Sequence, residues 1–339
     1  MKSNREIYHL CVQRQWDEIA RCVERGEWHA AAYVTDPSLG TKFSLLVCAA
    51  QDGVEALART LISRGADPNA RITDAQSALM VACEAGHESI VDLLLTAGAD
   101  VHKKWRGETT LMGAAQQNRK NVVKRLLRAG SRVTDTDGKG RSALSYAATR
   151  GGVDAEMITL LFNAGSPVNG RDLHVPVALR EEAVVRLLLS RRPDVNARFD
   201  WPSFGGAPVQ KGDTPLLVVA GDTMAEAMIK AGSPFGKLRP TERVAIVELL
   251  LAAGADVSVQ HPKSGWTPLL LATSSDEPEI AARLIRAGAD PRQEFECKFA
   301  RFPLSKPRTL TTKTISAVTL AQMRPRNKAV RQLLLETPT

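Results

Sequence analysis

The residues that could carry catalytic chemistry are few in this chain, and they are scattered. None of the six histidines has a second ligand at the spacing of a zinc site. The five cysteines form no Cys-x-x-Cys pair, and their odd count predicts reduced thiols rather than a disulfide framework. The glycine-rich stretch Gly138–Arg141 (GKGR) favours a plain turn over a phosphate-binding loop. We therefore predict a protein that is not an enzyme and needs no metal or cofactor.

Charge is the chemical feature with the clearest pattern. The formal net charge is +8, and residues 101–150 alone carry twelve basic and three acidic side chains. A second basic excess follows Arg292. Such a surface attracts an acidic protein, an anionic lipid surface or a nucleic acid, unless it is only a solvated face. In Arg119–Arg128 (RKNVVKRLLR) the apolar residues share one side of a helix, which favours a solvated outer face over a nucleic-acid site.

The elements that must position these side chains repeat along the chain. Ser77–Asp100 (SALMVACEAGHESIVDLLLTAGAD) contains two short apolar-periodic runs, and neither can bury its apolar face alone. A Ser or Thr able to cap a helix begins each such stretch at residues 44, 77, 109 and 142, with spacings of 33, 32 and 33 residues. Further starts fall near residues 175, 214, 267 and 316. The chain is therefore predicted to be an array of stacked helix pairs.

The pattern resembles the ankyrin repeat, in which a T-P-L-H-x-A run, a glycine, an apolar helix and a G-A-D turn recur about every 33 residues. The resemblance covers nearly the whole chain. It implies an all-α fold, an ankyrin-repeat solenoid of stacked helix-turn-helix units with β-hairpin fingers, with about eight to nine repeats of which several are degenerate. We place an N-terminal capping helix pair at residues 1–40 and the array at residues 41–339.

The later part of the array departs from the period. Long hairpin insertions are predicted at residues 198–213 and 292–314, and the alternation in Phe295–Phe299 indicates a short β-ribbon. The repeat that starts at residue 214 is about 20 residues too long. Within it, Met224–Ala231 is predicted to be the second helix, and Thr241–Ala253 another second helix whose partner is nearly deleted.

The resemblance implies that a partner binds the hairpin tips and the inner helices. Three of the five tryptophans fall in hairpin segments, and Trp and Arg dominate binding hot spots when a partner buries them. The competing interpretation is that each Trp packs on the neighbouring finger. The candidate partner-binding residues are Trp105, Arg106, Gln116, Gln117, Lys139, Arg141, Arg150, Trp201, Lys211, Lys263 and Trp266.

Three asparagines end their hairpins and have a leucine eight residues earlier: Asn69, Asn169 and Asn196. These positions are similar to sites that are hydroxylated in many ankyrin proteins, so they are candidate hydroxylation sites. The favoured interpretation is structural, with each asparagine side chain bonding the next finger.

We interpret the chain as a non-catalytic protein–protein interaction module or scaffold. It would bind a protein partner with an acidic surface through the fingers and the concave helix face. Two alternatives stay open: a structural accessory subunit embedded permanently in a larger assembly, and a basic surface that binds nucleic acid or another anionic partner. No membrane span is expected, because no apolar run of about 18 residues occurs. We expect a cytoplasmic location, with an organelle or the nucleus as alternatives.

Overall fold

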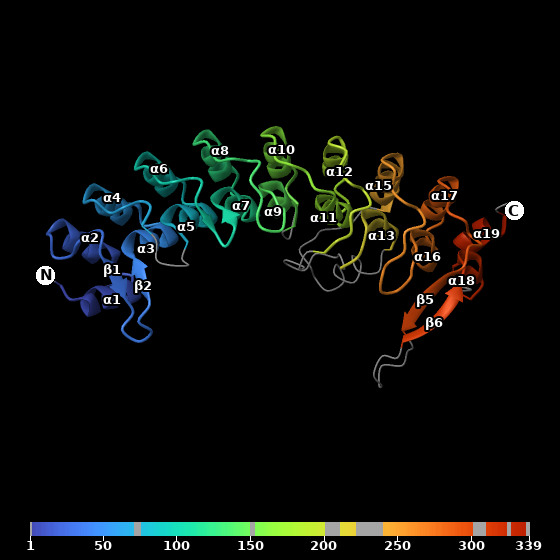
Figure 1. Cartoon of the computed structure of the whole chain (residues 1–339), viewed down its shortest axis with the longest axis horizontal. Coiled ribbons are helices and arrows are strands. Elements are labelled where there is room, and N and C mark those ends of the chain that lie inside the picture. The colour runs from blue at the N-terminus through green and yellow to red at the C-terminus, as the bar shows by residue number, and fades with distance from the viewer. Residues whose placement is uncertain are drawn as a thin grey trace. The chain divides into compact units, whose positions relative to one another are not determined.

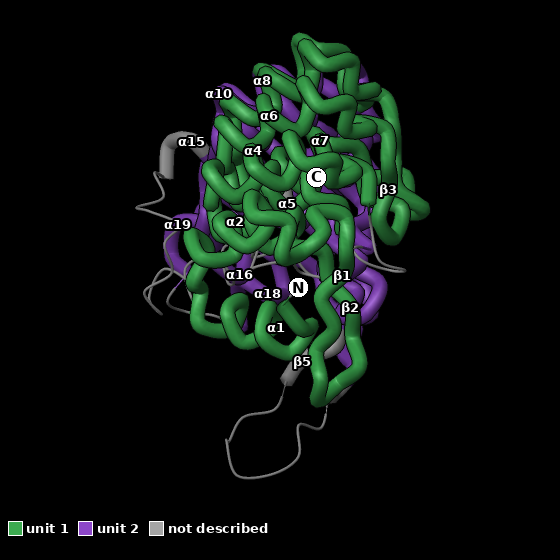
Figure 2. Tube along the Cα trace, turned by 90° about the vertical axis from the view of Figure 1, so that its left-hand side faces the viewer, with its two compact units in different colours: residues 1–147, 160–167 green, residues 148–159, 168–339 purple. Residues whose placement is uncertain are grey.

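The computed structural model describes residues 2–70, 76–149, 153–200, 211–221, 240–300, 310–323 and 327–336. The described chain consists of short helices in pairs, with hairpins or turns between the pairs (Figure 1). It divides into two compact units (Figure 2), which are residues 1–147 with 160–167 and residues 148–159 with 168–339.

The first unit alternates helices of an inner row and an outer row. The inner helices α3, α5 and α7 contact one another in that order, and so do the outer helices α2, α4, α6 and α8. Two helices, α9 (Ala143–Thr149) and α10 (Ala155–Asn163), contribute residues to both units. The other elements are α1 (Asn4–Val12), α2 (Trp16–Glu24), β1 (Tyr33–Thr35), β2 (Lys42–Ser44), α3 (Leu45–Asp52), α4 (Glu55–Ser63), α5 (Ala78–Ala85), α6 (Glu88–Thr96), β3 (Lys104–Trp105), β4 (Glu108–Thr109), α7 (Thr110–Gln116) and α8 (Lys120–Arg128).

Hydroxyl caps start the inner helices where the repeat pattern places a Ser or Thr. The Ser77 hydroxyl accepts a hydrogen bond from the Met80 N–H at 3.3 Å, and the Thr109 hydroxyl accepts one from the Met112 N–H at 3.2 Å. Small side chains such as Ala82 are fully buried between neighbouring inner helices. A short capped helix with a small-residue face cannot form a core by itself, so its stability comes from the helix pairs on either side.

The second unit repeats the two rows. The inner helices are α11, α13, α16 and α18, and the outer helices are α12, α15, α17 and α19, each in contact with the next of its row. The elements are η1 (Gly170–Leu173), α11 (His174–Ala178), α12 (Glu182–Leu189), α13 (Pro215–Ala220), α15 (Pro240–Ala252), α16 (Pro268–Ser274), α17 (Pro278–Arg286), β5 (Phe295–Ala300), β6 (Leu310–Ile315), α18 (Ala317–Met323) and α19 (Lys328–Glu336).

In the described part of the long repeat at residue 214, α13 and α15 form a helix pair, and the insertion between them lies outside the described residues. Helix α15 contacts α13 of its own pair and lies between α12 and α17 in the outer row. Helix α15 confirms the predicted second helix at Thr241–Ala253, and within the described residues the inner helix that it contacts is α13 rather than a nearly deleted one. The segment Met224–Ala231 lies outside the described residues. The sequence could not distinguish these arrangements, since an insertion within a pair and a lost inner helix lengthen the spacing alike.

A buried arginine, Arg243, binds the end of α13 at the point where the insertion begins. Helix α13 has only six residues and ends at Gly221 in an extended conformation. The Arg243 guanidinium, 3% exposed as a residue, donates to the Val219 carbonyl oxygen at 2.9 Å and forms an ion pair with Glu277. A cation at a helix C-terminus satisfies carbonyls that have no helical donor. Arg243 thereby joins the shortened helix to the next helix pair.

The strands of the described chain form three two-stranded antiparallel ribbons, β1–β2, β3–β4 and β5–β6. Helices make up the cores of both units, so the all-α prediction is confirmed. In the part of the chain that the structure describes, no helix is long and apolar enough to cross a membrane.

Candidate functional site

The β3–β4 finger presents an arginine stacked on a tryptophan. Trp105 pairs with Glu108 across the ribbon, and Arg106 and Gly107 form the tip with φ values of +50° and +86°. Two positive φ angles in succession are the signature of a tight hairpin turn, in which the second position favours glycine. The Arg106 Cζ lies 4.8 Å from the centroid of the Trp105 ring. Arg106 is exposed and Trp105 is half-buried, so a cation and an aromatic edge are offered together at the tip.

The next finger turns at residues 137–141 and is held by one carboxylate. The Asp137 Oδ1 accepts hydrogen bonds from the Lys139 N–H and the Arg141 N–H, each at 2.9 Å. These are the backbone donors that a phosphate-binding loop would need, so the interpretation as a plain turn is confirmed. The Lys139 side chain remains exposed at the tip.

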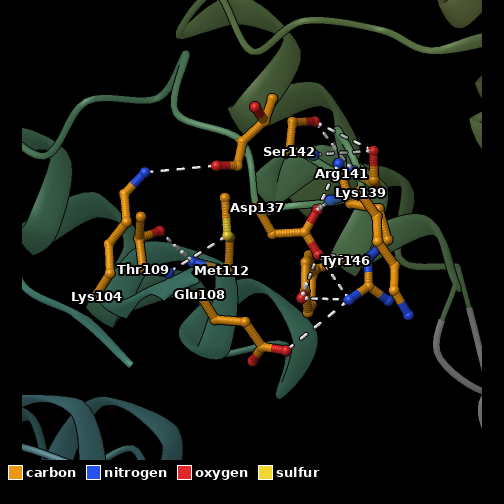
Figure 3. Close-up of polar contacts among 11 residues, drawn as sticks. Lys104, Glu108, Thr109, Met112, Asp137, Lys139, Arg141, Ser142 and Tyr146 are labelled. Atoms are coloured by element: carbon orange, nitrogen blue, oxygen red, sulfur yellow. Dashed lines mark hydrogen bonds and ion pairs between the residues drawn. The ribbon is translucent and has the colours of Figure 1, made fainter. Parts of the chain in front are cut away.

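A buried polar cluster lies below this turn (Figure 3). The Arg141 Nη2 lies 2.7 Å from the Asp137 Oδ2 and donates to the Tyr146 hydroxyl at 2.7 Å, while its Cζ lies 4.6 Å from the Tyr146 ring centroid. The Tyr146 hydroxyl donates in turn to the Asp137 Oδ2 at 3.1 Å. Burial by itself would raise the pKa of Asp137, but the hydrogen bonds from Arg141 and Lys139 outweigh it and lower that pKa.

The prediction that Arg141 is an exposed binding residue is therefore wrong. Its residue exposure is only 7%, because Asp137 and Tyr146 enclose its guanidinium from both sides. Arg141 stabilises the finger, and the exposed cation of this turn is Lys139.

The two fingers touch at their tips. A Cβ placed on Gly107 would lie 3.6 Å from the Gly138 N, and the Lys104 Nζ lies 3.4 Å from the Asp135 Oδ2. Arg106 precedes the first glycine of this contact and Lys139 follows the second. We call residues 105–108 together with residues 137–141 the first tip pair.

The second unit contains a comparable contact, between Gly212 and Pro262. A Cβ placed on Gly212, whose φ is +99°, would lie 2.5 Å from the Pro262 Cγ. Lys211 precedes this glycine and Lys263 follows the proline, and both lysines are exposed. The Phe199 N–H donates to the Asp213 carbonyl oxygen and the Gly212 N–H to the Phe199 carbonyl oxygen, so residues 211–213 lie at the base of their finger. We call residues 211–213 together with the turn at residues 261–266 the second tip pair. The sequence signal shared by both pairs is a basic residue directly before the contact glycine, Arg106 before Gly107 and Lys211 before Gly212, which the repeat pattern alone did not single out.

Histidine holds the turn of the second tip pair. The His261 Nδ1 accepts a hydrogen bond from the Ser264 N–H at 3.2 Å, and the His261 N–H donates to the Trp266 carbonyl oxygen at 2.9 Å. The His261 Nε2 is buried and lies 3.8 Å from the Asp213 Oδ1, which is beyond hydrogen-bond distance. The Arg198 Nη1 donates to the carbonyl oxygen of Gly212 at 3.0 Å and fixes the base of the preceding finger.

Several basic residues of the segment 101–149 are already paired within the fold. The Arg125 Nε donates to the Asp92 Oδ1 at 2.9 Å, and its Nη1 lies 2.9 Å from the Glu88 Oε2. The Arg119 Nε donates to the Glu84 carbonyl oxygen at 3.0 Å. These contacts join α8 and its N-cap residue Arg119 to the preceding helix pair. Arg119 and Arg125 therefore hold neighbouring repeats together in addition to facing solvent.

The remaining predicted residues are distributed over both units. Gln116 ends α7 and Gln117 caps it, and both are half-buried, as is Trp266 in the second tip pair. Arg150 and Trp201 lie outside the described residues. The structure thus brings together Trp105, Arg106 and Lys139 in the first unit, and Lys211, Lys263 and Trp266 in the second.

The candidate hydroxylation sites make structural hydrogen bonds. The Asn69 Nδ2 donates to the Gly98 carbonyl oxygen at 2.9 Å, and its Oδ1 accepts from the Asp100 N–H at 2.8 Å. Asn196 repeats both bonds with residues 254 and 256, across the insertion. The interpretation that the asparagine bonds the next finger is confirmed for these two residues. The Asn169 Oδ1 accepts from the Arg171 N–H and caps η1, and for this residue the bond to the next finger stays a prediction.

Chemistry-bearing groups outside the tips are sparse in the described ranges. There, no group of three or more His, Cys, Asp or Glu side chains could hold a metal ion. The cysteines are free thiols, and burial raises the pKa of Cys11 to about 11 and that of Cys48 to about 12, which disfavours the reactive thiolate.

Comparisons with known proteins match the repeat pattern. A family model described as "Ankyrin repeats (3 copies)" matches residues 9–105, 45–137 and 111–199, and one described as "Ankyrin repeat" matches residues 264–294. Ankyrin repeat and KH domain-containing protein mask-1 of Caenorhabditis elegans is 29% identical over 274 residues, which cover 75% of this chain and 10% of the relative.

Two further relatives match shorter stretches. Probable E3 ubiquitin-protein ligase XBOS32 of Oryza sativa subsp. japonica is 37% identical over 114 residues, 31% of this chain and 22% of the relative. Ankyrin repeat domain-containing protein 63 of Mus musculus is 28% identical over 162 residues, 42% of this chain and 41% of the relative. The chain therefore spans less than half the length of each of the three relatives.

Proposed function

The chain belongs to the ankyrin-repeat family, and we propose that it is a non-catalytic interaction module that binds a protein partner with an acidic surface. Membership of this family supports protein interaction in general. The choice of an acidic partner rests on the first tip pair, where Arg106 and Lys139 are exposed on adjoining fingers beside Trp105.

The charge balance at the first tip pair supports this proposal. The acidic side chains of the two fingers face basic side chains of the same fingers: Asp135 lies 3.4 Å from both the Lys104 Nζ and the Arg132 Nε, and Asp137 pairs with Arg141. The ends that project to solvent are the cations Arg106 and Lys139. A partner that approaches the tips therefore meets positive charge, which steers an acidic surface toward them.

The aromatic ring adds a reason for a protein partner. The tight turn already holds the backbone of Trp105 and Arg106 in a hairpin, so little backbone entropy is lost when a partner buries them. Trp and Arg are the residue types that contribute most when they are desolvated at the centre of a protein interface. For nucleic acid, the same cations would act mainly through phosphate contacts, with a steep dependence on salt.

The test captures partners from cells with the full chain and with a double variant, Arg106→Ala with Lys139→Ala. Arg128→Ala is the matched control, because Arg128 is an exposed cation of the first unit that lies on α8 and not at a tip. Mass spectrometry of the captured proteins should show acidic partners that the double variant loses and the control keeps. An unchanged set with the double variant, or capture that disappears after nuclease treatment, would contradict the proposal.

A further inference from the structure

The β5–β6 ribbon of the second unit is the longest pair of strands in the described chain. It is antiparallel, with Phe295 opposite Ile315, Cys297 opposite Lys313 and Ala300 opposite Leu310 (Figure 1). Strands of six residues are long for a finger, since β1 and β2 have three residues each. A two-stranded ribbon has two edges, and each edge presents backbone N–H and C=O groups that the partner strand does not use.

The edge of β5 is covered by the preceding finger. The Cys297 Sγ donates to the Gly265 carbonyl oxygen at 3.4 Å, and Cys297 is fully buried. Gly265 fits so closely against the backbone of β5 that a Cβ on it would overlap the Glu296 carbonyl oxygen. At Glu296 and Cys297, a peptide could not approach β5 without displacing this finger.

The edge of β6 is open within the described residues. Thr312, Lys313 and Thr314 are exposed in succession. Among the residues that the structure describes, no backbone hydrogen bond joins β6 to a segment other than β5. In a two-stranded antiparallel ladder, alternate residues of each strand direct their N–H and C=O groups away from the partner strand, so those of β6 point to its other edge.

The charge along this edge selects what can pair with it. Lys313 stands in the middle of β6, and β6 contains no acidic residue. A lysine in the middle of an edge strand opposes pairing with a like-charged strand, which includes a second copy of β6. The same lysine favours an acidic side chain directly across the pair.

From these observations we propose that β6 binds an extended acidic segment of a partner protein as a third strand. Backbone hydrogen bonds to the open edge would provide affinity without sequence preference, and Lys313 would select an acidic residue at the opposing position. The site is separate from the first tip pair, which belongs to the other compact unit.

The experiment measures binding of a fluorescent peptide of alternating Val and Glu to the full chain by anisotropy. Two further peptides are matched controls: one is N-methylated at alternate residues along one edge, and one has Lys in place of Glu. We expect binding of the first peptide and loss of binding with both controls. Lys313→Glu should weaken binding by about threefold to tenfold, because an opposite-charge pair becomes a like-charge pair.

Two readouts show whether β6 itself is the site. Hydrogen exchange should slow for amides of residues 310–315 when the peptide is added, because edge N–H groups become hydrogen-bonded. The Arg106→Ala and Lys139→Ala double variant should bind the peptide as well as the unaltered chain does, so failure at the tips and failure at β6 are distinguishable.

Three outcomes would overturn the proposal. The first is equal binding of the N-methylated peptide, which would show that no strand is added. The second is that the unmodified peptide does not bind. The third is self-association of the chain that Lys313→Glu alters, which would make a second copy the occupant of the edge.

Discussion

The first and second tip pairs use the same kind of contact but hold their turns with different acceptors. In each pair a positive-φ glycine of one finger meets the turn of the next, and an exposed cation flanks the contact on each finger. In the first pair a carboxylate accepts from the backbone N–H groups of the turn, and in the second an imidazole does. The comparison shows that turns of this kind can be held by either acceptor, because each offers a lone pair to the backbone N–H groups of the turn.

The N-terminal finger follows the first arrangement. The Asp36 Oδ1 accepts from the Ser38 N–H at 2.7 Å, and hydrogen bonds from Ser38 lower the pKa of Asp36 to about 2. Of the turns at Asp36, Asp137 and His261, only the last, which follows the long insertion, has a histidine in this role. The difference predicts that the two units respond differently to substitution.

The largest effect is expected from Arg141→Ala in the first unit. The substitution leaves the Asp137 carboxylate and the Tyr146 hydroxyl buried without their cationic partner, which costs about 3–5 kcal/mol of unfolding free energy. Tyr146→Phe removes one hydroxyl and keeps the ion pair, so it should cost about 1 kcal/mol. Urea denaturation followed by circular dichroism measures both. Equal losses for the two variants would show that the ion pair does not stabilise the finger.

The second unit should lose stability at mildly acidic pH through His174. His174 is the first residue of α11, and its imidazole is fully buried. The Nδ1 atom lies 3.1 Å from the Arg171 carbonyl oxygen, and the Nε2 atom lies 2.9 Å from the Asp213 carbonyl oxygen. Burial lowers the pKa of His174 to about 4, although both carbonyls favour the protonated ring.

The sign of this effect follows from proton uptake. An unfolded histidine titrates near about 6.5, so between that pH and about 4 the unfolded chain binds a proton that the folded chain does not, and stability falls as the pH falls. The loss attributable to His174 should be about 2 kcal/mol at about pH 5. His174→Gln should flatten the pH dependence measured by urea unfolding of the second unit. A variant with the same slope as the unaltered chain would contradict this assignment.

The glycines provide the most direct test of the shared contact. Both Gly107→Ala and Gly212→Ala place a side chain on a positive-φ residue, which costs about 1 kcal/mol. Gly212→Ala should cost more, by about another 1 kcal/mol or more, because its Cβ overlaps Pro262 whereas that of Gly107 has ordinary contact distance to Gly138. Thermal unfolding of the two variants should show this order. The reverse order would mean that the second contact is not closely packed.

The smallest effect on stability is expected at the exposed cations. Arg106→Ala and Lys139→Ala should each change the unfolding free energy by less than about 0.5 kcal/mol, because both side chains project to solvent. Their effect should appear in partner binding instead. A large loss of stability in either variant would show that the cation supports the finger and is not available to a partner.

The regular features of the fold could be predicted from the sequence because each depends on residues that are close together in the chain. Hydroxyl caps such as Ser77 and Thr109, the small residues between inner helices and the alternation at Phe295 each identify their element without reference to distant parts of the chain. The pairing of α15 with α13 was not predictable in this way, because it depends on where the insertion falls.

The candidate site was less predictable for the same reason. Arg141 occupies a tip position in the repeat pattern, and only the packing of Tyr146 over its guanidinium reveals that it is buried. Arg106 and Lys139 lie on adjoining fingers because Gly107 contacts Gly138, and these two glycines are 31 residues apart in the sequence. A repeat pattern fixes the position of a residue within its own finger and leaves the contacts between fingers open.

One measurement tests the central claim most directly, namely that the first tip pair binds an acidic protein. It is the affinity of the captured partner for the chain that carries both Arg106→Glu and Lys139→Glu. The control is Arg128→Glu, which reverses the charge of an exposed arginine away from the tips. The account predicts that the tip variant binds at least about tenfold more weakly than the control. Equal affinities for the two variants would contradict it.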